Sequence, residues 1–274
     1  MNKIIFLFTI FSCLSRIAFS RFQQKKLIIG NWKSFVSPAG ASQLAYSIHQ
    51  SFAKMPLSVD KQVVLLPSLL QFSDIHRIFS GTDVRVGTQH CSEYPAGAYT
   101  GEVCAHSLKE AGCEHCLVGH NERRQYCGEG EFHFYERTLQ LLSNGIVPVY
   151  CVGDTYEDLN EGNTVYTCLS QIRGLVSYLL QHPEIQPHQI SQIVFVYEPA
   201  WAIGTGLTPD GSFADQVYCS IHSFLSHRYR IQPTILYGGS VKRDNLNKMR
   251  MYDGLLVGKA SVSADTFVDI CRNF

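Results

Sequence analysis

The sequence predicts an α/β fold and, within that class, a single-domain (β/α)₈ barrel. Eight short apolar runs recur along the chain, and each ends in a polar or glycine-rich loop. The segments between the runs carry apolar residues at helical spacing, and strands that alternate with helices are typical of a parallel sheet. Eight such units in about 250 residues match the size of this barrel.

Residues 1–25 differ in composition from the rest of the chain. Lys3 precedes an apolar run over residues 4–14, and Ala18-Phe19-Ser20 has the small residues of a cleavage site. This is the outline of a secretory signal peptide, although Arg16 interrupts it. The apolar run is too short to span a membrane as a helix. The alternative is a disordered extension, with residues 26–274 as a cytoplasmic domain that is exported only if residues 1–20 act as a signal.

The composition is that of an ordinary globular protein with no global electrostatic preference. The 274 residues are 45% hydrophobic and 17% charged, with a formal net charge of zero. No overall field therefore attracts nucleic acid or an anionic membrane. The ten cysteines are scattered, and we interpret Cys113-Glu114-His115-Cys116 as structural because no second pair lies at zinc spacing.

The predicted strands and helices alternate along the chain. The strands are expected at 27–30, 63–66, 84–87, 116–118, 146–152, 193–197, 234–237 and 255–257. Helical spacing is carried by Leu44, Ile48 and Phe52; by Phe134, Leu139 and Leu142; by Leu169, Ile172, Val176 and Leu180; and by Val217, Ile221 and Leu225. A doubly wound sheet is the structural rival. It normally carries a glycine-rich turn after its first strand, and Gly30-Asn31-Trp32-Lys33 does not have that pattern.

Unusual polar residues concentrate directly after the predicted strands. They are Asn31, Lys33, His120, Glu122, Arg123, Asp154, Glu198, Gly238-Gly239-Ser240 and Gly258-Lys259. In a barrel all of these strand ends meet at one mouth, where barrel active sites lie. The opposite ends carry no comparable cluster, and this asymmetry is the main argument for an enzyme. Each residue taken alone has a structural interpretation, such as a surface charge or a helix cap.

The segment Tyr197–Gly206 combines a candidate base with a candidate lid. Glu198 ends a buried apolar strand, Pro199 stops the strand, and a small-residue loop with Trp201 as its one large apolar group follows. A stiff start and glycine pivots suggest a lid that closes over the site. The glycine-rich loops after 234–237 and 255–257 lead into helices, and such loops hold phosphate in many barrels. Gly204 adds another donor when the lid closes.

The remaining chemistry is identified by elimination. Glu198 has no partner carboxylate for a glycosidase pair, no His/Asp/Cys cluster has metal spacing, and no serine sits in a nucleophile elbow. A carboxylate base, a polarising histidine and a cation remain. These three groups suffice to remove a proton next to a carbonyl, and this reaction needs no cofactor.

Several of these stretches resemble the signature stretches of triosephosphate isomerases, the family after which the TIM barrel is named. They are Gly30-Asn31-Trp32-Lys33, Gly97-Ala98-Tyr99-Thr100-Gly101-Glu102, Gly119-His120-Asn121-Glu122-Arg123-Arg124, Tyr197–Gly206, Tyr237-Gly238-Gly239-Ser240 and Leu256-Val257-Gly258. The resemblance covers residues 26–274 in order. It implies the interconversion of dihydroxyacetone phosphate and glyceraldehyde 3-phosphate in glycolysis and gluconeogenesis.

The resemblance also assigns roles to the polar residues of the mouth. Glu198 is expected to shuttle the proton, and His120 to polarise the carbonyl as a neutral imidazole; this family is itself a well-known case of that tuning. Asn31 and Lys33 are expected to contact the substrate, with Glu122 holding Lys33 in place. Phosphate is expected on Gly204, Ser240, Gly258 and Lys259, with Tyr237 and Ser240 locking the closed lid.

The family resemblance further implies a homodimer and exposes three departures. Thr100 is expected to enter the partner's site, and Arg123 to pair with the partner subunit's Glu102. Lys259 stands where the family usually has a second glycine, Asn121 where it has serine, and Ser34-Phe35 where it has Met-Asn. Lysine at 259 costs on the order of 1 kcal/mol if that backbone needs a positive φ.

Two other functions remain open at this point. The first is a phosphate-binding barrel that serves as an exported surface or interaction protein, against which the intact set of Glu198, His120 and Lys33 argues. The second is a barrel isomerase for another phosphorylated substrate, which the motif match disfavours.

Overall fold

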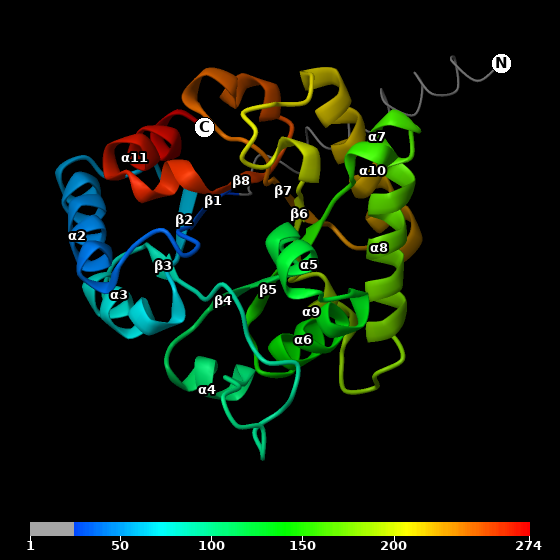
Figure 1. Ribbon diagram of the computed structural model, residues 1–274, viewed down its shortest axis with the longest axis horizontal. Helices are drawn as coiled ribbons and strands as arrows, with labels where there is room; N and C mark the ends of the chain where they lie inside the picture. The colour runs from blue at the N-terminus through cyan, green and yellow to red at the C-terminus, as the bar shows by residue number, and fades with distance from the viewer. Residues whose placement is uncertain (1–24) are drawn as a thin grey trace.

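Eight parallel strands form one sheet, and helices ring it on the outside (Figure 1). The computed structural model describes residues 25–274. The strands are β1 (Lys26–Asn31), β2 (Lys61–Leu66), β3 (Arg85–Val86), β4 (His115–Val118), β5 (Val147–Val152), β6 (Val194–Tyr197), β7 (Thr234–Tyr237) and β8 (Gly254–Val257). All eight coincide with the predicted apolar runs, so the (β/α)₈ barrel is confirmed.

The order of the sheet is β3-β2-β1-β8-β7-β6-β5-β4, and the two end strands meet through residues that follow β3. Thr88 forms a parallel bridge with Cys116. The Thr88 N–H donates to the His115 carbonyl, and the Leu117 N–H donates to the Thr88 carbonyl, each at 2.9 Å. A single bridge therefore closes the barrel, whereas the β1–β2 pair is in register over six residues. We call this junction the seam.

The α-helices and 3₁₀ helices lie between the strands along the chain. The α-helices are α2 (Pro38–Lys54), α3 (Phe72–Ile78), α4 (Ala105–Glu110), α5 (Asn121–Cys127), α6 (Glu131–Ser143), α7 (Tyr156–Asn160), α8 (Thr164–Leu179), α9 (Pro187–Ile190), α10 (Gly211–Tyr229) and α11 (Ala264–Asn273). The 3₁₀ helices are η2 (Leu69–Gln71), η3 (Ala200–Ala202), η4 (Arg243–Met249) and η5 (Lys259–Val262).

The apolar residues divide into two cores because each strand is buried on both faces. Ile29, Val64, Val149 and Val196 belong to the inner core, which fills the barrel. A larger core lies between the strands and the helices, and it includes the predicted helical positions Ile48, Phe134, Ile172 and Ile221. Leu180 departs from the prediction: it lies at the C-cap of α8 and is exposed, because the helix ends at Leu179.

Two sequence-based expectations concern the N-terminal segment and the Cys113–Cys116 motif. The proposed signal peptide at residues 1–20 lies outside the described residues. Within residues 25–274, no helix is both long and apolar enough to cross a membrane.

Cys113 and Cys116 are fully buried at the turn and start of β4, as expected for structural cysteines. Burial raises the pKa of the Cys113 thiol to about 12, which keeps it protonated.

Candidate active site

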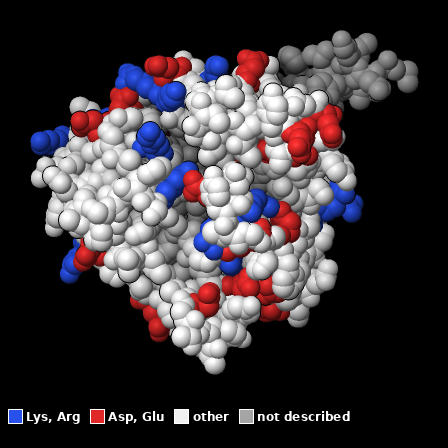
Figure 2. Space-filling model, in the orientation of Figure 1, with Lys and Arg blue, Asp and Glu red and all other residues white. Residues whose placement is uncertain are grey.

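The candidate active site lies at the mouth formed by the carboxyl ends of the strands. The loops after β1, β4, β5, β6, β7 and β8 supply the predicted side chains, as the barrel topology requires. Figure 2 shows basic and acidic side chains interspersed on the face that it draws, without a broad patch of one sign. This distribution agrees with the zero net charge of the chain, so an anionic ligand has to be held by local groups.

Glu198 and His120 face each other at the centre of the mouth. His120 Nε2 lies 3.2 Å from Glu198 Oε1, and the two residues are only 5% and 2% exposed. The other carboxylate oxygen, Oε2, accepts a hydrogen bond of 3.1 Å from the Asn121 backbone N–H. Within the described residues Oε1 makes no hydrogen bond of its own. Glu198 is therefore anchored through one oxygen and has the other available at the site.

His120 is fixed by its place at the start of α5. It is the N-cap residue, and its Nδ1 accepts a hydrogen bond of 3.2 Å from the Glu122 backbone N–H. A ring nitrogen that accepts a hydrogen bond carries no proton, so the remaining proton of the neutral ring is on Nε2. The Nε2–H group is the one that faces Glu198. The neutral imidazole expected from the family resemblance is thus compatible with this capping geometry.

Lys33, Glu122 and Asn31 form a connected group beside this pair. The Lys33 ammonium lies 2.6 Å from Glu122 Oε1, and Asn31 Oδ1 accepts a hydrogen bond of 3.0 Å from the Lys33 backbone N–H. Lys33 has a φ of 49°, an uncommon left-handed conformation for a residue with a side chain. Such strain is frequent at functional sites. The contact between Lys33 and Glu122 is the one expected from the family resemblance.

Two glycines allow the backbone to approach Glu198 closely. A Cβ atom on Gly153 would stand 1.9 Å from the Glu198 carbonyl oxygen, and one on Gly238 would stand 2.8 Å from Glu198 Cγ. A side chain at Gly153 would displace the backbone of Glu198, and one at Gly238 would displace its side chain. Cys151 lies close to Glu198 as well. Burial, followed by the charge of Glu198, raises the pKa of the Cys151 thiol well above its usual value.

The candidate lid comprises residues 199–209, between β6 and α10. Gly204 and Gly206 have φ values of 72° and 79°, so both need glycine, and both are exposed. Trp201, predicted as an apolar anchor, also donates its indole N–H to Asp154 Oδ2 at 3.2 Å. Asp154 additionally accepts from Tyr197 at 3.1 Å and Thr164 at 2.6 Å. Burial raises the pKa of Asp154, although these three hydrogen bonds oppose the shift.

The predicted phosphate-binding residues lie in the lid and in the loops after β7 and β8. A Cβ atom on Gly258 would stand 3.3 Å from Lys33 Cε, so the loop after β8 touches the lysine. Lys259 opens η5, and it is not among the described residues with a positive φ. The Ser240 hydroxyl donates to the Ala202 carbonyl in the lid at 2.7 Å. The Tyr237 hydroxyl is buried and has no hydrogen-bond partner among the described residues.

The predicted interface residues lie on and beside an exposed loop. Thr100 and Glu102 are exposed in the loop between β3 and α4, which projects from the barrel in Figure 1. Tyr94 and Tyr99 stack within this loop at a centroid distance of 4.4 Å. Arg123 binds Glu129 of its own chain through Nε at 3.1 Å and through Nη2. Among residues 25–274, these are the hydrogen bonds of the Arg123 guanidinium, and Nη1 takes no part in them.

Several residues around the site were not assigned a role by the sequence. Arg124 donates to the Gly119 carbonyl at 2.9 Å and to the Cys151 carbonyl at 3.2 Å, which ties the loop after β4 to the end of β5. Asp154 was noted only as a residue after a strand, and its contact with the lid depends on tertiary packing. Asn245 contacts the lid as well, and no motif in the sequence indicates it.

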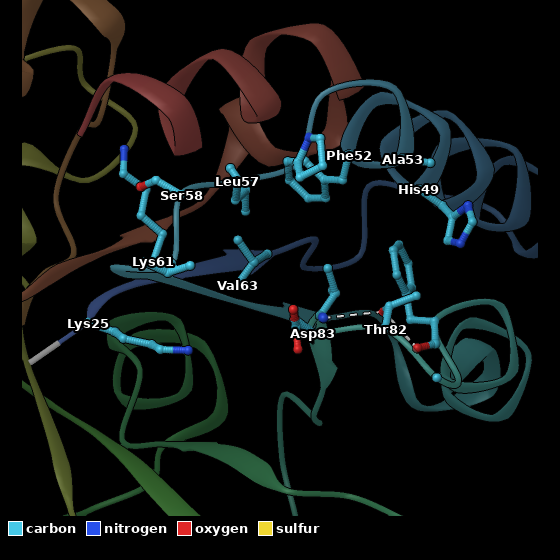
Figure 3. A pocket seen from close by; sticks show the side chains of 15 residues that line it. Lys25, His49, Phe52, Ala53, Leu57, Ser58, Lys61, Val63, Thr82 and Asp83 are labelled. Atoms are coloured by element: carbon cyan, nitrogen blue, oxygen red, sulfur yellow. Dashed lines mark hydrogen bonds between the residues drawn. The ribbon is translucent and has the colours of Figure 1, made fainter.

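Features elsewhere in the structure do not compete with this site. A cavity of about 360 Å³ lies at the amino ends of β1–β3, at the opposite end of the barrel, where Phe52, Leu57 and Val63 line it (Figure 3). Lys61 at this cavity is already bonded to the Cys271 and Arg272 carbonyls, at 2.9 and 2.7 Å. Across residues 25–274, no group of three or more His, Cys, Asp or Glu side chains is arranged to hold a metal ion.

Comparison with known proteins gives one consistent result. The family model described as triosephosphate isomerase matches residues 26–274. A triosephosphate isomerase of Leptospira interrogans is 37% identical over 258 residues, which cover 90% of this chain and 99% of the relative. Those of Prosthecochloris aestuarii and of a Thermoanaerobacter species are 35% and 32% identical, with 91% and 90% of this chain and 98% of each relative covered.

Proposed function

The chain belongs to the triosephosphate isomerase family and is an isomerase of triose phosphates, and we propose that Glu198 is the base that moves the proton. The reaction interconverts dihydroxyacetone phosphate and glyceraldehyde 3-phosphate through an enediolate, in glycolysis and gluconeogenesis. The observation that carries the assignment is the contact of Glu198 Oε1 with His120 Nε2 at 3.2 Å. A carboxylate base and an N–H donor thus meet at one point, where a carbonyl and its neighbouring carbon can both be reached.

In the proposed proton transfer, Glu198 first accepts a proton from one carbon of the substrate and then donates it to the neighbouring carbon. Glu198 removes a proton from the carbon next to the carbonyl; the electron pair of that C–H bond forms the carbon–carbon double bond, and the π pair of the carbonyl moves onto its oxygen. His120 Nε2–H and the Lys33 ammonium stabilise the negative charge that develops there. The first oxygen takes a proton from His120 Nε2 and becomes a hydroxyl, and the second oxygen gives its proton back to that nitrogen and becomes the carbonyl as Glu198 returns its proton to the neighbouring carbon. Asn31 supports Lys33 through its 3.0 Å hydrogen bond to the lysine backbone.

We propose that the phosphate group of the substrate is held by the lid and by the loops after β7 and β8. Backbone N–H groups of Gly204, Ser240, Gly258 and Lys259 are the donors, and oriented amides of this kind bind anions well. Gly204 belongs to the exposed tip of the lid, so its contact depends on lid closure. The buried Tyr237 hydroxyl lacks a partner among the described residues, which supports a role for it in holding the closed lid.

A coupled isomerase assay on the purified protein tests this assignment. The Glu198→Asp variant moves the carboxylate back by about one methylene, and a misplacement of about 1 Å can cost 10²-fold in rate. We expect kcat to fall by about that factor with KM changed much less. Glu110→Asp, at a side chain that is 71% exposed on α4, is the matched control. Unreduced turnover by Glu198→Asp would refute the role of Glu198, and an inactive wild-type protein would refute the function.

We further propose a cytoplasmic homodimer in which the loop between β3 and α4 enters the partner. Thr100 reaches the partner's site, and Glu102 pairs with Arg123 across the interface. The exposed positions of Thr100 and Glu102 and Arg123 Nη1, which makes no hydrogen bond within residues 25–274, support this arrangement. The match of the family model to residues 26–274 supports the division into a short N-terminal extension and a barrel domain.

A further inference from the structure

Asn245 is a buried polar residue beside the lid, and its side chain is fully engaged. It lies in η4, after β7, and is 8% exposed. Its Nδ2 donates to Thr208 Oγ1 at 3.0 Å and to the Ser240 carbonyl at 2.8 Å. Its Oδ1 accepts from the Lys242 backbone N–H at 2.8 Å. One amide group therefore joins two segments that are more than 30 residues apart in the chain.

The two segments are the end of the lid and the loop that carries Ser240. Thr208 stands next to Pro209 at the C-terminal end of the lid, and we call residues 238–242 the phosphate loop. The phosphate loop also touches the start of the lid, where Ser240 donates to the Ala202 carbonyl at 2.7 Å. Near the lid tip, the Lys242 ammonium lies 3.6 Å from the position of a Cβ atom on Gly206. The phosphate loop thus approaches the lid near its start and near its tip.

We infer that Asn245 is a positioning residue for the isomerisation, which holds the C-terminal end of the lid and the phosphate loop in one arrangement. The inference rests on the proposed function, because it takes the phosphate of the substrate to bind between Gly204 and Ser240. Asn245 is set back from this point and acts through Thr208 and Ser240. Its hydrogen bonds remove freedom from both segments before substrate arrives, so less entropy is lost when phosphate binds.

The positioning role predicts an effect that depends on the phosphate group. Binding energy from the non-reacting part of a substrate is used for orientation, so a substrate without phosphate should not benefit from Asn245. In Asn245→Ala, the Ser240 carbonyl and the Lys242 N–H lose their buried partner, and one such hydrogen bond is worth about tenfold in an equilibrium. We expect kcat/KM for glyceraldehyde 3-phosphate to fall about tenfold, and the inhibition constant of inorganic phosphate to rise by a similar factor.

The closing experiment compares two substrates and the alanine variants of two asparagines. Activity is measured with glyceraldehyde 3-phosphate and with D-glyceraldehyde, for wild type, Asn245→Ala and the matched control Asn247→Ala. Asn247 lies in the same 3₁₀ helix but is exposed, and within the described part of the chain its side chain accepts a hydrogen bond from Arg250 alone. The expected result is a selective loss in Asn245→Ala with the phosphorylated substrate. Equal losses with both substrates, or the same loss in Asn247→Ala, would overturn the inference.

A second pair of variants keeps the test valid if Asn245→Ala does not fold. Thr208→Val removes the acceptor of the Asn245 hydrogen bond, whereas Thr208→Ser retains it. We expect Thr208→Val to weaken inorganic phosphate binding, measured by calorimetry, and Thr208→Ser to restore it. Equal phosphate affinity in both variants would overturn the inference. Because calorimetry needs no turnover, an inactive wild-type protein would count against the proposed function and leave this measurement as an independent test of Asn245.

Discussion

At the scale of single residues, proton transfer at the mouth depends on which atoms of each side chain are already hydrogen-bonded or ion-paired within the protein. Glu198 is anchored at Oε2 by the Asn121 backbone N–H, so this contact does not depend on the side chain at position 121. The replacement of the usual serine by Asn121 therefore leaves the anchoring of Glu198 intact. Lys33 is engaged by Glu122 at 2.6 Å, which orients its ammonium and neutralises its charge until a substrate anion arrives.

Lys259 provides a prediction at the same scale. Its backbone is not left-handed, because Lys33 and Arg230 are the non-glycine residues with positive φ in the described part of the chain. Lys259→Gly therefore relieves no strain and adds freedom to the unfolded chain, which lowers the free energy of unfolding by about 0.4–1 kcal/mol. Urea unfolding measures this change.

Arg230→Gly is the contrasting control for Lys259→Gly. Arg230 has a φ of 57° at the C-cap of α10, where glycine relieves strain of about 1 kcal/mol. We expect this variant to be at least as stable as wild type in the same urea titration. Stabilisation by Lys259→Gly, to the level of Arg230→Gly, would contradict the backbone conformation described at residue 259.

At the scale of elements, the sequence predicts what local patterns encode and misses what tertiary packing creates. The run that forms β6 is β-branched and uninterrupted, and the polar Glu198 marks its end, so both strand and candidate base follow from local sequence. The positions of His120 and Lys33 then follow from barrel topology. Asn245 and the role of Asp154 were not predicted, because their partners lie 37 and 47 residues away and no local pattern specifies such contacts.

The seam between β3 and β4 is the element with the weakest pairing, and two neutral histidines lie on it. His115 precedes Cys116, and His90 lies two residues after Thr88. Burial lowers the pKa of His115 to about 4, with the charge of Arg85 as a second cause. Burial, followed by the charges of Arg137 and Arg123, lowers the pKa of His90 to about 4 as well. Both side chains are therefore neutral in the folded protein at pH 5.

The seam histidines predict a loss of stability in mild acid. Their pKa values are lower in the folded than in the unfolded state, so their contribution is complete above pH 6.5 and is lost as the pH falls toward 4. Each histidine lowers the free energy of unfolding by up to about 1.4 kcal/mol per pH unit in this range. Urea unfolding at pH 7 and pH 5 measures the change, and we expect His115→Leu to reduce it. The control is His106→Leu, at a 60% exposed side chain, for which we expect the same change in the free energy of unfolding between pH 7 and pH 5 as in wild type. An equally unchanged value in His115→Leu would contradict the prediction.

The lid gives a second prediction at the scale of elements. Pro209 is buried between Thr208 and the N-cap residue of α10, Asp210, and its ring restricts φ at the end of the lid. We expect Pro209→Ala to change lid opening and product release by on the order of threefold, with proton transfer affected less. The viscosity dependence of kcat reports on release, and the deuterium isotope effect reports on proton transfer. Pro183→Ala, at an exposed turn after α8, is the control. An unchanged kcat under conditions where release is rate-limiting would count against this role.

At the scale of the whole molecule, the barrel brings its strand ends to one mouth, and one of the loops extends well beyond it. The loops after β1, β4, β5, β6, β7 and β8 carry the candidate site, whereas the loop between β3 and α4 projects away from the barrel (Figure 1). Its stacked Tyr94 and Tyr99 are exposed together with Thr100 and Glu102. A protruding loop with exposed aromatic side chains is a common feature of protein interfaces. The proposed homodimer gives this loop a partner.

The last prediction concerns that assembly. If Glu102 pairs with the Arg123 guanidinium across the interface, Glu102→Arg places two like charges in contact and should weaken self-association by about tenfold or more. Sedimentation velocity at a series of protein concentrations measures the effect. The activity per chain should fall at the concentrations where monomers appear, since Thr100 then no longer reaches the partner's site. Glu184→Arg, at a side chain 54% exposed beyond α8, should associate as the wild type does. A wild-type protein that is monomeric and fully active would show that the projecting loop has another role, because one chain would then supply every residue that the reaction needs.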